Sequence, residues 1–95
     1  MGLLTSDEIT QALAVMPGWE RQGDAIVREF SLDGGFLGSV GFVNRLAAAA
    51  EAADHHPDLA IAWNRVTVTL STHSAGGITD KDIALAREAD GLIGA

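Results

Sequence analysis

Cysteine is absent from this chain of 95 residues, which excludes disulfide bonds and thiolate chemistry. Cations are few: six lysine and arginine residues are scattered along the sequence against 13 aspartate and glutamate residues, and the net charge is −7. This balance has the wrong sign for binding the phosphates of nucleic acid or an anionic membrane surface. We therefore expect no direct contact with nucleic acid or membrane.

Long apolar runs are also missing, and none approaches the roughly 18 to 20 residues that a membrane-spanning helix needs. The first residues reach Asp7 and Glu8 too soon for a signal peptide. At the same time 47% of the residues are hydrophobic, which is typical of a folded globular protein. The composition predicts one soluble, cytoplasmic domain over residues 1–95, whose small core would gain stability from oligomerisation.

Proline occurs only twice, and each proline predicts the end of a helix. Pro17 closes a segment in which apolar residues recur at helical spacing. Pro57 follows a longer helical segment over residues 36–53 and restricts His56 to extended backbone, so this helix has to end near residues 54–55. Two of the three predicted helix ends are therefore set by proline.

Small residues mark the helix predicted over residues 36–53. Gly38 and Gly41 each cost roughly 0.8 to 1 kcal/mol relative to alanine in a helix interior. We interpret both glycines as points where another backbone approaches closely. The four alanines at 47–50 would allow tight packing against a sheet or a partner chain.

Hydroxyl residues followed three positions later by a carboxylate predict the starts of two helices. Thr5 with Glu8 begins the first helix, and Thr79 with Asp82 begins the last. Turn residues at 22–24 separate two short extended runs between the first two helices. A second pair of strands lies between the last two helices.

That second pair is predicted as a hairpin, because Val66, Val68 and Leu70 alternate with polar residues. Asn64-Arg65 is the predicted turn, since asparagine can enter the left-handed region of backbone space. The order is helix, two strands, helix, two strands, helix. This order predicts an α+β domain in which helices cover one face of an antiparallel sheet.

Only three histidines are present, and two of them, His55 and His56, are adjacent. A hairpin turn centred on Asn64-Arg65 sets a register in which His56 faces His73. All three imidazoles would then gather at the open end of one hairpin. Because imidazole exchanges protons near neutral pH, this cluster suits a reaction that removes a proton at one point and protonates a leaving group at another.

Zinc is the alternative use of such a cluster, since three histidines can form a catalytic zinc site. Adjacent histidines on extended backbone point to opposite faces, so His55 and His56 are poorly placed to bind one ion. Glu51, four residues before His55, is expected to lie on the same helical face and to fix the tautomer of that imidazole. We therefore favour acid–base chemistry without a metal.

The spacing of these residues resembles the signature of the pterin-4a-carbinolamine dehydratases. The matching positions, each at the interval that the family has, are Glu51, His55-His56-Pro57, Trp63, His73 and Asp82. The capped first helix that runs into Pro-Gly-Trp and the Asp-initiated last helix also resemble the family. The resemblance covers nearly the whole chain.

The resemblance implies a four-stranded antiparallel sheet with three helices packed on one face, assembled as a homodimer or homotetramer. It implies the dehydration of 4a-hydroxytetrahydropterin to quinonoid dihydropterin. That step recycles the cofactor of aromatic amino acid hydroxylases, so such a hydroxylase is expected in the same pathway. The reaction needs neither a metal nor an organic cofactor.

Carried over by position, the resemblance also implies roles for six residues. The catalytic residues would be His55, His56 and His73, and the substrate-binding residues would be Glu51, Trp63 and Asp82. We expect His56 to be the principal acid/base, while the division of acid and base between the imidazoles stays open. Leu59 stands where many members carry an aromatic residue, and the loop after His73 lacks their acidic residue; both differences affect the packing of the pocket.

A second hypothesis is a non-catalytic protein-interaction module on the same fold. Some members of the family act as dimerisation cofactors of a homeodomain transcription factor, and a role as an assembly factor belongs to the same class. The alanine-rich stretch 47–50 could pack against a helix of such a partner.

Overall fold

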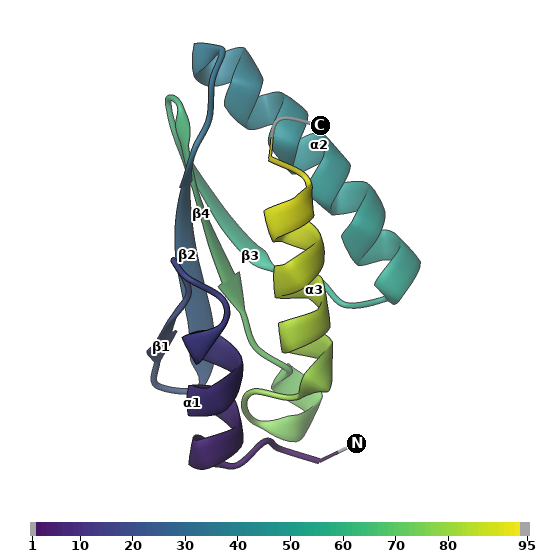
Figure 1. Cartoon of the computed structure of the whole chain (residues 1–95). Coiled ribbons are helices and arrows are strands. Elements are labelled where there is room, and N and C mark those ends of the chain that lie inside the picture. The colour runs from purple at the N-terminus through teal and green to yellow at the C-terminus, as the bar shows by residue number, and fades with distance from the viewer. Residues whose placement is uncertain (1, 94–95) are drawn as a thin grey trace.

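Three helices lie against one face of a four-stranded antiparallel sheet in the computed structural model, which describes residues 2–93 (Figure 1). The helices are α1 (Ser6–Ala14), α2 (Gly35–Ala53) and α3 (Asp80–Gly91), and the strands are β1 (Glu20–Gln22), β2 (Ala25–Ser31), β3 (Asp58–Ala62) and β4 (Arg65–Leu70). A short 3-10 turn, η1 (His73–Ala75), links β4 to α3. The predicted fold class and the predicted order of helices and strands are confirmed. Within residues 2–93, no helix is long and apolar enough to cross a membrane.

Capping boxes begin α1 and α3, as the sequence predicts. The N–H of Glu8 donates to the Thr5 hydroxyl, and the N–H of Thr5 donates to the Glu8 carboxylate at 2.8 Å. At α3 the N–H of Thr79 donates to Oδ2 of Asp82 at 2.9 Å, and Thr79 Oγ1 accepts from the N–H of Lys81. These bonds satisfy amides at each helix start that have no partner within the helix.

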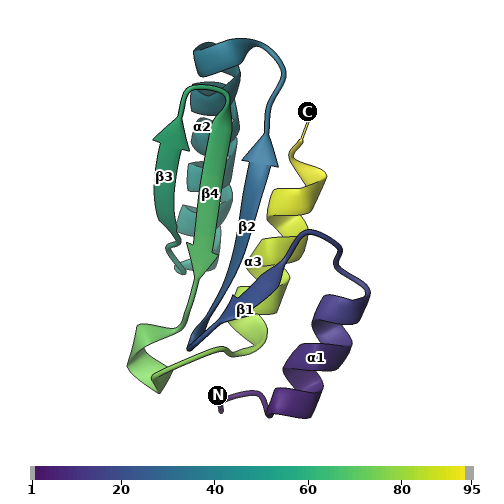
Figure 2. The ribbon, with the colours of Figure 1, turned by 90° about the vertical axis from the view of Figure 1, so that its left-hand side faces the viewer.

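The sheet has the strand order β1-β2-β4-β3, so β2 and β4 are central and β3 lies at an edge. Figure 2 shows the sheet in front, with α2 and α3 behind it. Alternate side chains of the two central strands point toward the helices and are buried; these are Ile26, Phe30, Val66, Val68 and Leu70. Together with side chains of the helices they form one continuous hydrophobic core.

The close backbone approach predicted at Gly38 is confirmed, whereas the one predicted at Gly41 is wrong. A Cβ at Gly38 would lie 1.9 Å from the carbonyl oxygen of Asp33, which leads into α2. A Cβ at Gly41 would meet only the end of the flexible Arg45 side chain, at 3.4 Å. The approach at Gly38 arises because two glycines of positive φ fold the chain back between β2 and α2.

The turn between β3 and β4 lies one residue earlier than predicted. Ala62 pairs with Arg65, so the turn consists of Trp63-Asn64 and not of Asn64-Arg65. The register of the hairpin shifts accordingly, and the paired strands stop before they reach the histidines. The prediction that His56 faces His73 across the ladder is therefore wrong.

Contacts from outside the hairpin account for the position of this turn. Ser39 of α2 donates its hydroxyl to the carbonyl of Trp63 at 2.5 Å, and the N–H of Leu32 donates to the carbonyl of Asn64 at 2.7 Å. The indole lies against Gly35, where an added Cβ would come within 3.5 Å of Nε1. These contacts hold Trp63 at a φ of 51°, a value for which asparagine would have the stronger local preference.

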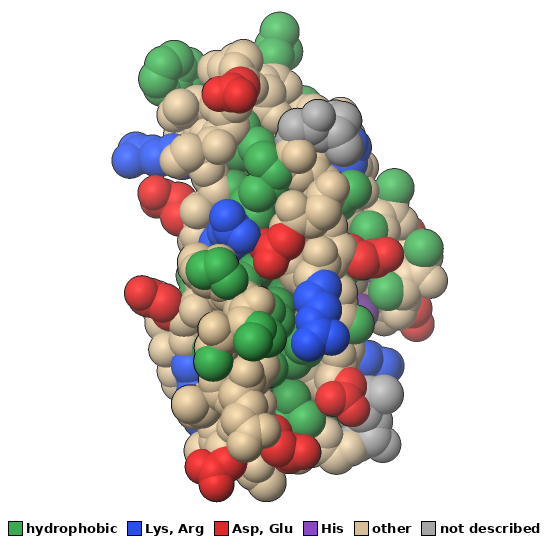
Figure 3. Space-filling model, in the orientation of Figure 1, with side chains coloured by type: hydrophobic (Ala, Val, Ile, Leu, Met, Phe, Trp, Pro, Cys, Tyr) green, Lys and Arg blue, Asp and Glu red, His purple; other side chains and the backbone are tan. Residues whose placement is uncertain are grey.

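On the face shown in Figure 3, acidic and basic side chains are interspersed over the surface. Large apolar side chains are exposed at the end of the molecule where the chain passes from β2 into α2 and where β3 turns into β4. They are Phe36, Leu37 and Trp63. Leu59 and Ile61 of the edge strand β3 are also exposed.

Candidate active site

All three histidines of the chain line one cavity of about 270 Å³. His55 and His56 belong to the link between α2 and β3, and His73 begins the turn η1 after β4. The other lining residues are Asp54, Ser71, Thr72, Ser74 and Lys81. The cavity thus forms where the ends of α2 and β4 meet the start of α3, and the segments just before and just after the hairpin bring the histidines together.

The backbone directs His55 into the protein. Helix α2 ends at Ala53, and Asp54 follows it in the left-handed conformation with a φ of 49°. The N–H of His55 then donates to the carbonyl of Ala50 at 3.0 Å, as is common where a helix ends with a left-handed residue. Only 8% of His55 stays exposed, and its Nε2 lies 2.6 Å from Oδ1 of Asp82, which is fully buried.

Glu51 pairs with His56 and not, as predicted, with His55. Its carboxylate contacts Nε2 of His56, and both side chains are exposed to solvent. The predicted pair was wrong because α2 ends at Ala53, before it can carry His55 on the helical face of Glu51. The two adjacent histidines thus have different partners, a buried carboxylate for His55 and an exposed one for His56.

Of the other predicted site residues, Glu51 and Asp82 do not line the cavity but contact His56 and His55, whereas Trp63 is brought neither to the cavity nor to its histidines. It lies in the turn between β3 and β4, and 69% of the residue is exposed. Figure 2 shows that this turn and the turn η1 lie at opposite ends of β4. Within one chain, therefore, Trp63 is separated from His73 by the length of a strand.

Five lining residues with polar or charged side chains were not predicted as site residues, and Thr72 and Lys81 are two of them. The only sequence signal for them is adjacency, since Thr72 precedes His73 and Lys81 precedes Asp82. Thr72 is buried, and its hydroxyl donates to Oδ2 of Asp82 at 2.9 Å. The buried carboxylate is therefore bonded on one oxygen to the imidazole and on the other to hydroxyl and amide donors.

The arrangement suits proton transfer at more than one point. A carboxylate partner fixes the orientation and the tautomer of an imidazole, and both His55 and His56 have such a partner. His73 adds a third imidazole to the same cavity. Among residues 2–93, no three histidine, aspartate or glutamate side chains are arranged to hold a metal ion.

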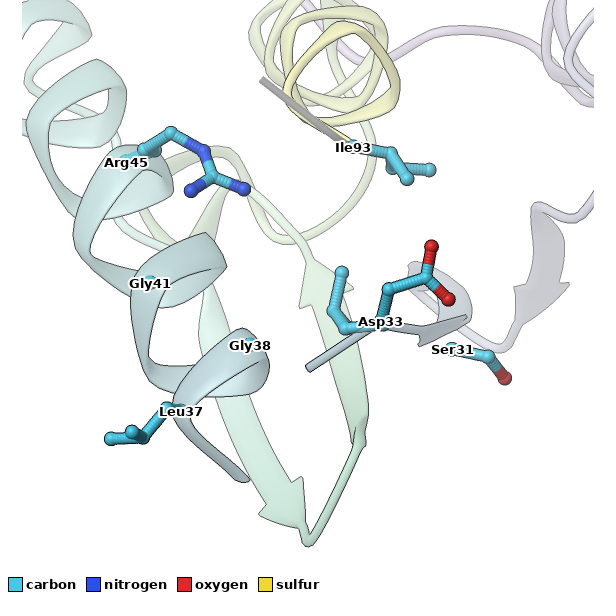
Figure 4. A pocket seen from close by; sticks show the side chains of 8 residues that line it. Ser31, Asp33, Leu37, Gly38, Gly41, Arg45 and Ile93 are labelled. Atoms are coloured by element: carbon cyan, nitrogen blue, oxygen red, sulfur yellow. The ribbon is translucent and has the colours of Figure 1, made fainter. Parts of the chain in front are cut away.

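A second cavity, of about 260 Å³, lies between the first half of α2 and the end of α3 (Figure 4). Its charged side chains are Asp33 and Arg45, and Ile93 and Leu37 contribute apolar surface. Arg45 donates from Nη2 to the carbonyl of Leu92 at 3.1 Å, which ties α2 to the end of α3. None of the predicted site residues lines this cavity.

The sequence is similar to that of known proteins over almost its whole length. The family model described as pterin 4 alpha carbinolamine dehydratase matches residues 2–92. A protein of Mycobacteroides abscessus that carries the provisional name of a pterin-4-alpha-carbinolamine dehydratase is 54% identical over 94 residues, which cover 99% of each chain. A protein of the same provisional name from Thermosynechococcus vestitus is 55% identical over 84 residues, which cover 88% of this chain and 87% of the relative.

Two solved structures share the fold. The transcriptional coactivator/pterin dehydratase of Brucella melitensis superposes with a TM-score of 0.92 and 40% identity, over 98% of this chain and 100% of that one. A pterin dehydratase-like protein, identified as a RuBisCO assembly factor in the alpha-carboxysome, superposes with a TM-score of 0.67 and 26% identity, over 82% of this chain and 92% of that one. By sequence and by fold, this chain belongs to the pterin 4 alpha carbinolamine dehydratase family.

Proposed function

We propose that this protein removes water from 4a-hydroxytetrahydropterin and releases quinonoid dihydropterin, with histidines as acid and base. The observation that supports the proposal best is the cavity lined by all three histidines, which stand at the positions of the family signature. Membership of the family supports the substrate class. By this proposal the whole chain acts as one cytoplasmic domain that helps to recycle the tetrahydropterin of aromatic amino acid hydroxylases.

The reaction needs two proton transfers of opposite sense. N5 of the pterin loses a proton, while the 4a-hydroxyl gains one and leaves as water, so protons and electrons balance without a further reactant. Imidazoles exchange protons near neutral pH and are suited to both transfers. We assign the principal acid/base role to His56, which is exposed at the cavity and is paired with Glu51.

The other predicted residues take supporting roles in this proposal. His55 is held by the buried Asp82, and His73 supplies a third imidazole from η1. Glu51 orients His56, because their side chains are in contact. A role of Trp63 in substrate binding stays a prediction from the resemblance, since Trp63 lies at the other end of the hairpin.

Stopped-flow measurement of the decay of chemically generated 4a-hydroxytetrahydropterin tests the proposal. The folded wild-type protein should accelerate the decay in proportion to its concentration, and heat-denatured protein at the same concentration is the control. Decay at the same rate in buffer and in the presence of folded protein would overturn the proposed activity.

The exposed apolar residues support a second candidate function, a protein-interaction module. Phe36, Leu37 and Trp63 form an apolar surface at one end of the molecule, and large exposed apolar surfaces are typical of contacts with other proteins. Two structural relatives are described as a transcriptional coactivator and as an assembly factor. Capture of a defined partner by wild type and by His56→Ala alike, but not by Leu37→Asp, would favour this function.

We also propose that the protein is a homo-oligomer. Strand β3 is the free edge of the sheet next to α2, and all five of its residues are exposed. An edge strand presents unpaired backbone N–H and C=O groups to a second chain. Leu59 and Ile61 add exposed apolar area on the helix side of that edge, which supports association of two copies there.

A further inference from the structure

Two buried threonine hydroxyls lie beside the cavity and belong to none of the predicted site positions. Thr72 and Thr79 are both buried, and their Oγ1 atoms are 2.7 Å apart. The backbone of Thr72 is fixed as well, because its N–H donates to the carbonyl of Gly77 at 2.8 Å. Both hydroxyls are therefore held in defined positions next to Asp82.

The neighbours of these hydroxyls decide which one donates to the other. Each hydroxyl has a single proton, and Thr72 Oγ1 donates its proton to Oδ2 of Asp82 at 2.9 Å. Thr79 Oγ1 accepts from the N–H of Lys81 at 3.3 Å, so its own proton is free for the bond to Thr72. The chain of hydrogen bonds consequently runs in one direction, from Lys81 through both threonines to the carboxylate.

The carboxylate then faces donors only. Oδ2 of Asp82 accepts from the hydroxyl of Thr72 and from the N–H of Thr79, and Oδ1 lies 2.6 Å from Nε2 of His55. Because an ionised carboxylate accepts and does not donate, Nε2 of His55 has to carry the proton of that bond. Nδ1 is then the ring nitrogen that remains for exchange of a proton.

We propose that Thr72 and Thr79 are positioning residues for His55: their hydroxyls form a directed hydrogen-bond relay that fixes the carboxylate of Asp82, keeps a proton on Nε2 of His55 and leaves Nδ1 for catalysis. The catalytic part of this inference rests on the proposed dehydratase function. The relay itself does not, since it follows from the donors and acceptors around Asp82. In this proposal Asp82 acts through His55, since its own side chain is fully buried.

Three variants test the relay. Thr72→Val keeps the volume of the side chain and removes the hydroxyl, whereas Thr72→Ser keeps the hydroxyl. Thr69→Val is the matched control, because Thr69 lies half-buried on β4 and points to the open face of the sheet, away from the cavity. A merely structural role of Thr72 would change stability in proportion to lost packing and would not be rescued by serine.

The first readout is the nuclear magnetic resonance of the His55 ring, which needs no activity. In wild type, Thr72→Ser and Thr69→Val we expect the ring proton on Nε2, with slow exchange with water. In Thr72→Val we expect this exchange to be faster, because the carboxylate has lost a donor. A wild-type ring with its proton on Nδ1, or unchanged exchange in Thr72→Val, would overturn the relay.

The second readout is stopped-flow decay of 4a-hydroxytetrahydropterin. Loss of one hydrogen bond to a charged group should lower kcat of Thr72→Val roughly tenfold with little change of KM, and Thr72→Ser should recover wild-type kcat. Equal kcat in Thr72→Val and Thr69→Val would overturn the positioning role. If wild type is inactive, the proposed function fails, while the ring resonance still decides the relay. If Thr72→Val fails to fold, the relay is tested by the tautomer of His55 in wild type and by the exchange of its ring proton with water in Thr72→Ser.

Discussion

Asp82 divides its two carboxylate oxygens between two tasks. Oδ2 accepts the N–H of Thr79 and so completes the cap of α3, and Oδ1 forms a hydrogen bond with Nε2 of His55. The sequence alone allowed a capping role or a site role for Asp82, and the geometry gives it both contacts. A single buried carboxylate therefore couples the start of a helix to the candidate site.

Asp82→Asn should consequently affect both stability and activity. The side-chain amide would place an N–H₂ group opposite other hydrogen-bond donors. We therefore expect the free energy of unfolding to fall by about 2 kcal/mol or more, as when a buried hydrogen bond to a charged group is broken. We also expect a lower kcat. Urea unfolding and stopped-flow kinetics measure the two effects. Asp80→Asn, at an exposed position of the same helical turn, is the control, and equal losses in both variants would contradict the assignment.

Glu51 offers the opposite case, because its side chain is exposed and contributes little to the core. Glu51→Gln should leave the free energy of unfolding unchanged within about 0.5 kcal/mol. If the carboxylate orients His56, kcat should still fall, by roughly tenfold. Glu88→Gln, exposed on α3, should change neither quantity. A kcat of Glu51→Gln equal to that of wild type would make Glu51 an ordinary solvated residue of α2.

At the scale of helices and strands, features that depend on residues close in sequence could be predicted, whereas contacts between elements could not. The capping boxes and the alternation along β4 predict the helices and the hairpin, because both depend on near neighbours. The turn was misplaced because Ser39 and Leu32, which are distant in sequence, hold the carbonyls of Trp63-Asn64. The three histidines were likewise predicted to meet by strand pairing, although the segments before β3 and after β4, which lie outside the paired strands, bring them together.

The two glycines of α2 provide a prediction at this scale. Gly38→Ala should destabilise the protein by roughly 3 kcal/mol or more, because its Cβ would overlap the carbonyl of Asp33 and force the backbone to move. Gly41→Ala should be neutral or should stabilise by up to about 1 kcal/mol, since alanine is the better helix former and only the flexible end of Arg45 is near. Urea unfolding compares them, and equal effects of the two substitutions would contradict the packing described for α2.

At the scale of the whole molecule, the exposed apolar surfaces indicate where other chains could bind. The edge strand β3 is exposed along its full length, and large apolar side chains lie on it and at the end of the sheet where α2 begins. A chain of 95 residues buries a modest fraction of its surface, so association of copies would add to its stability. Oligomerisation and the binding of another protein are thus the two uses that this surface supports.

Ile61→Lys tests association through the edge of the sheet. Wild type should elute as a dimer or tetramer in size-exclusion chromatography with light scattering, and Ile61→Lys should shift it toward monomer, because an inserted charge opposes pairing of edge strands. Val15→Lys, at an exposed apolar position directly after α1, should leave the oligomer intact. A monomeric wild type, or an unchanged oligomer in Ile61→Lys, would contradict the proposed interface.

The central claim is that the histidine cavity performs the dehydration, and the stopped-flow rate of His56→Ala tests it most directly. Removal of a general acid or base should lower kcat/KM roughly 100-fold or more, with the fold retained, since His56 is exposed. Arg87→Ala, exposed on α3 away from the cavity, should keep the wild-type rate. A wild-type rate in His56→Ala would contradict the account.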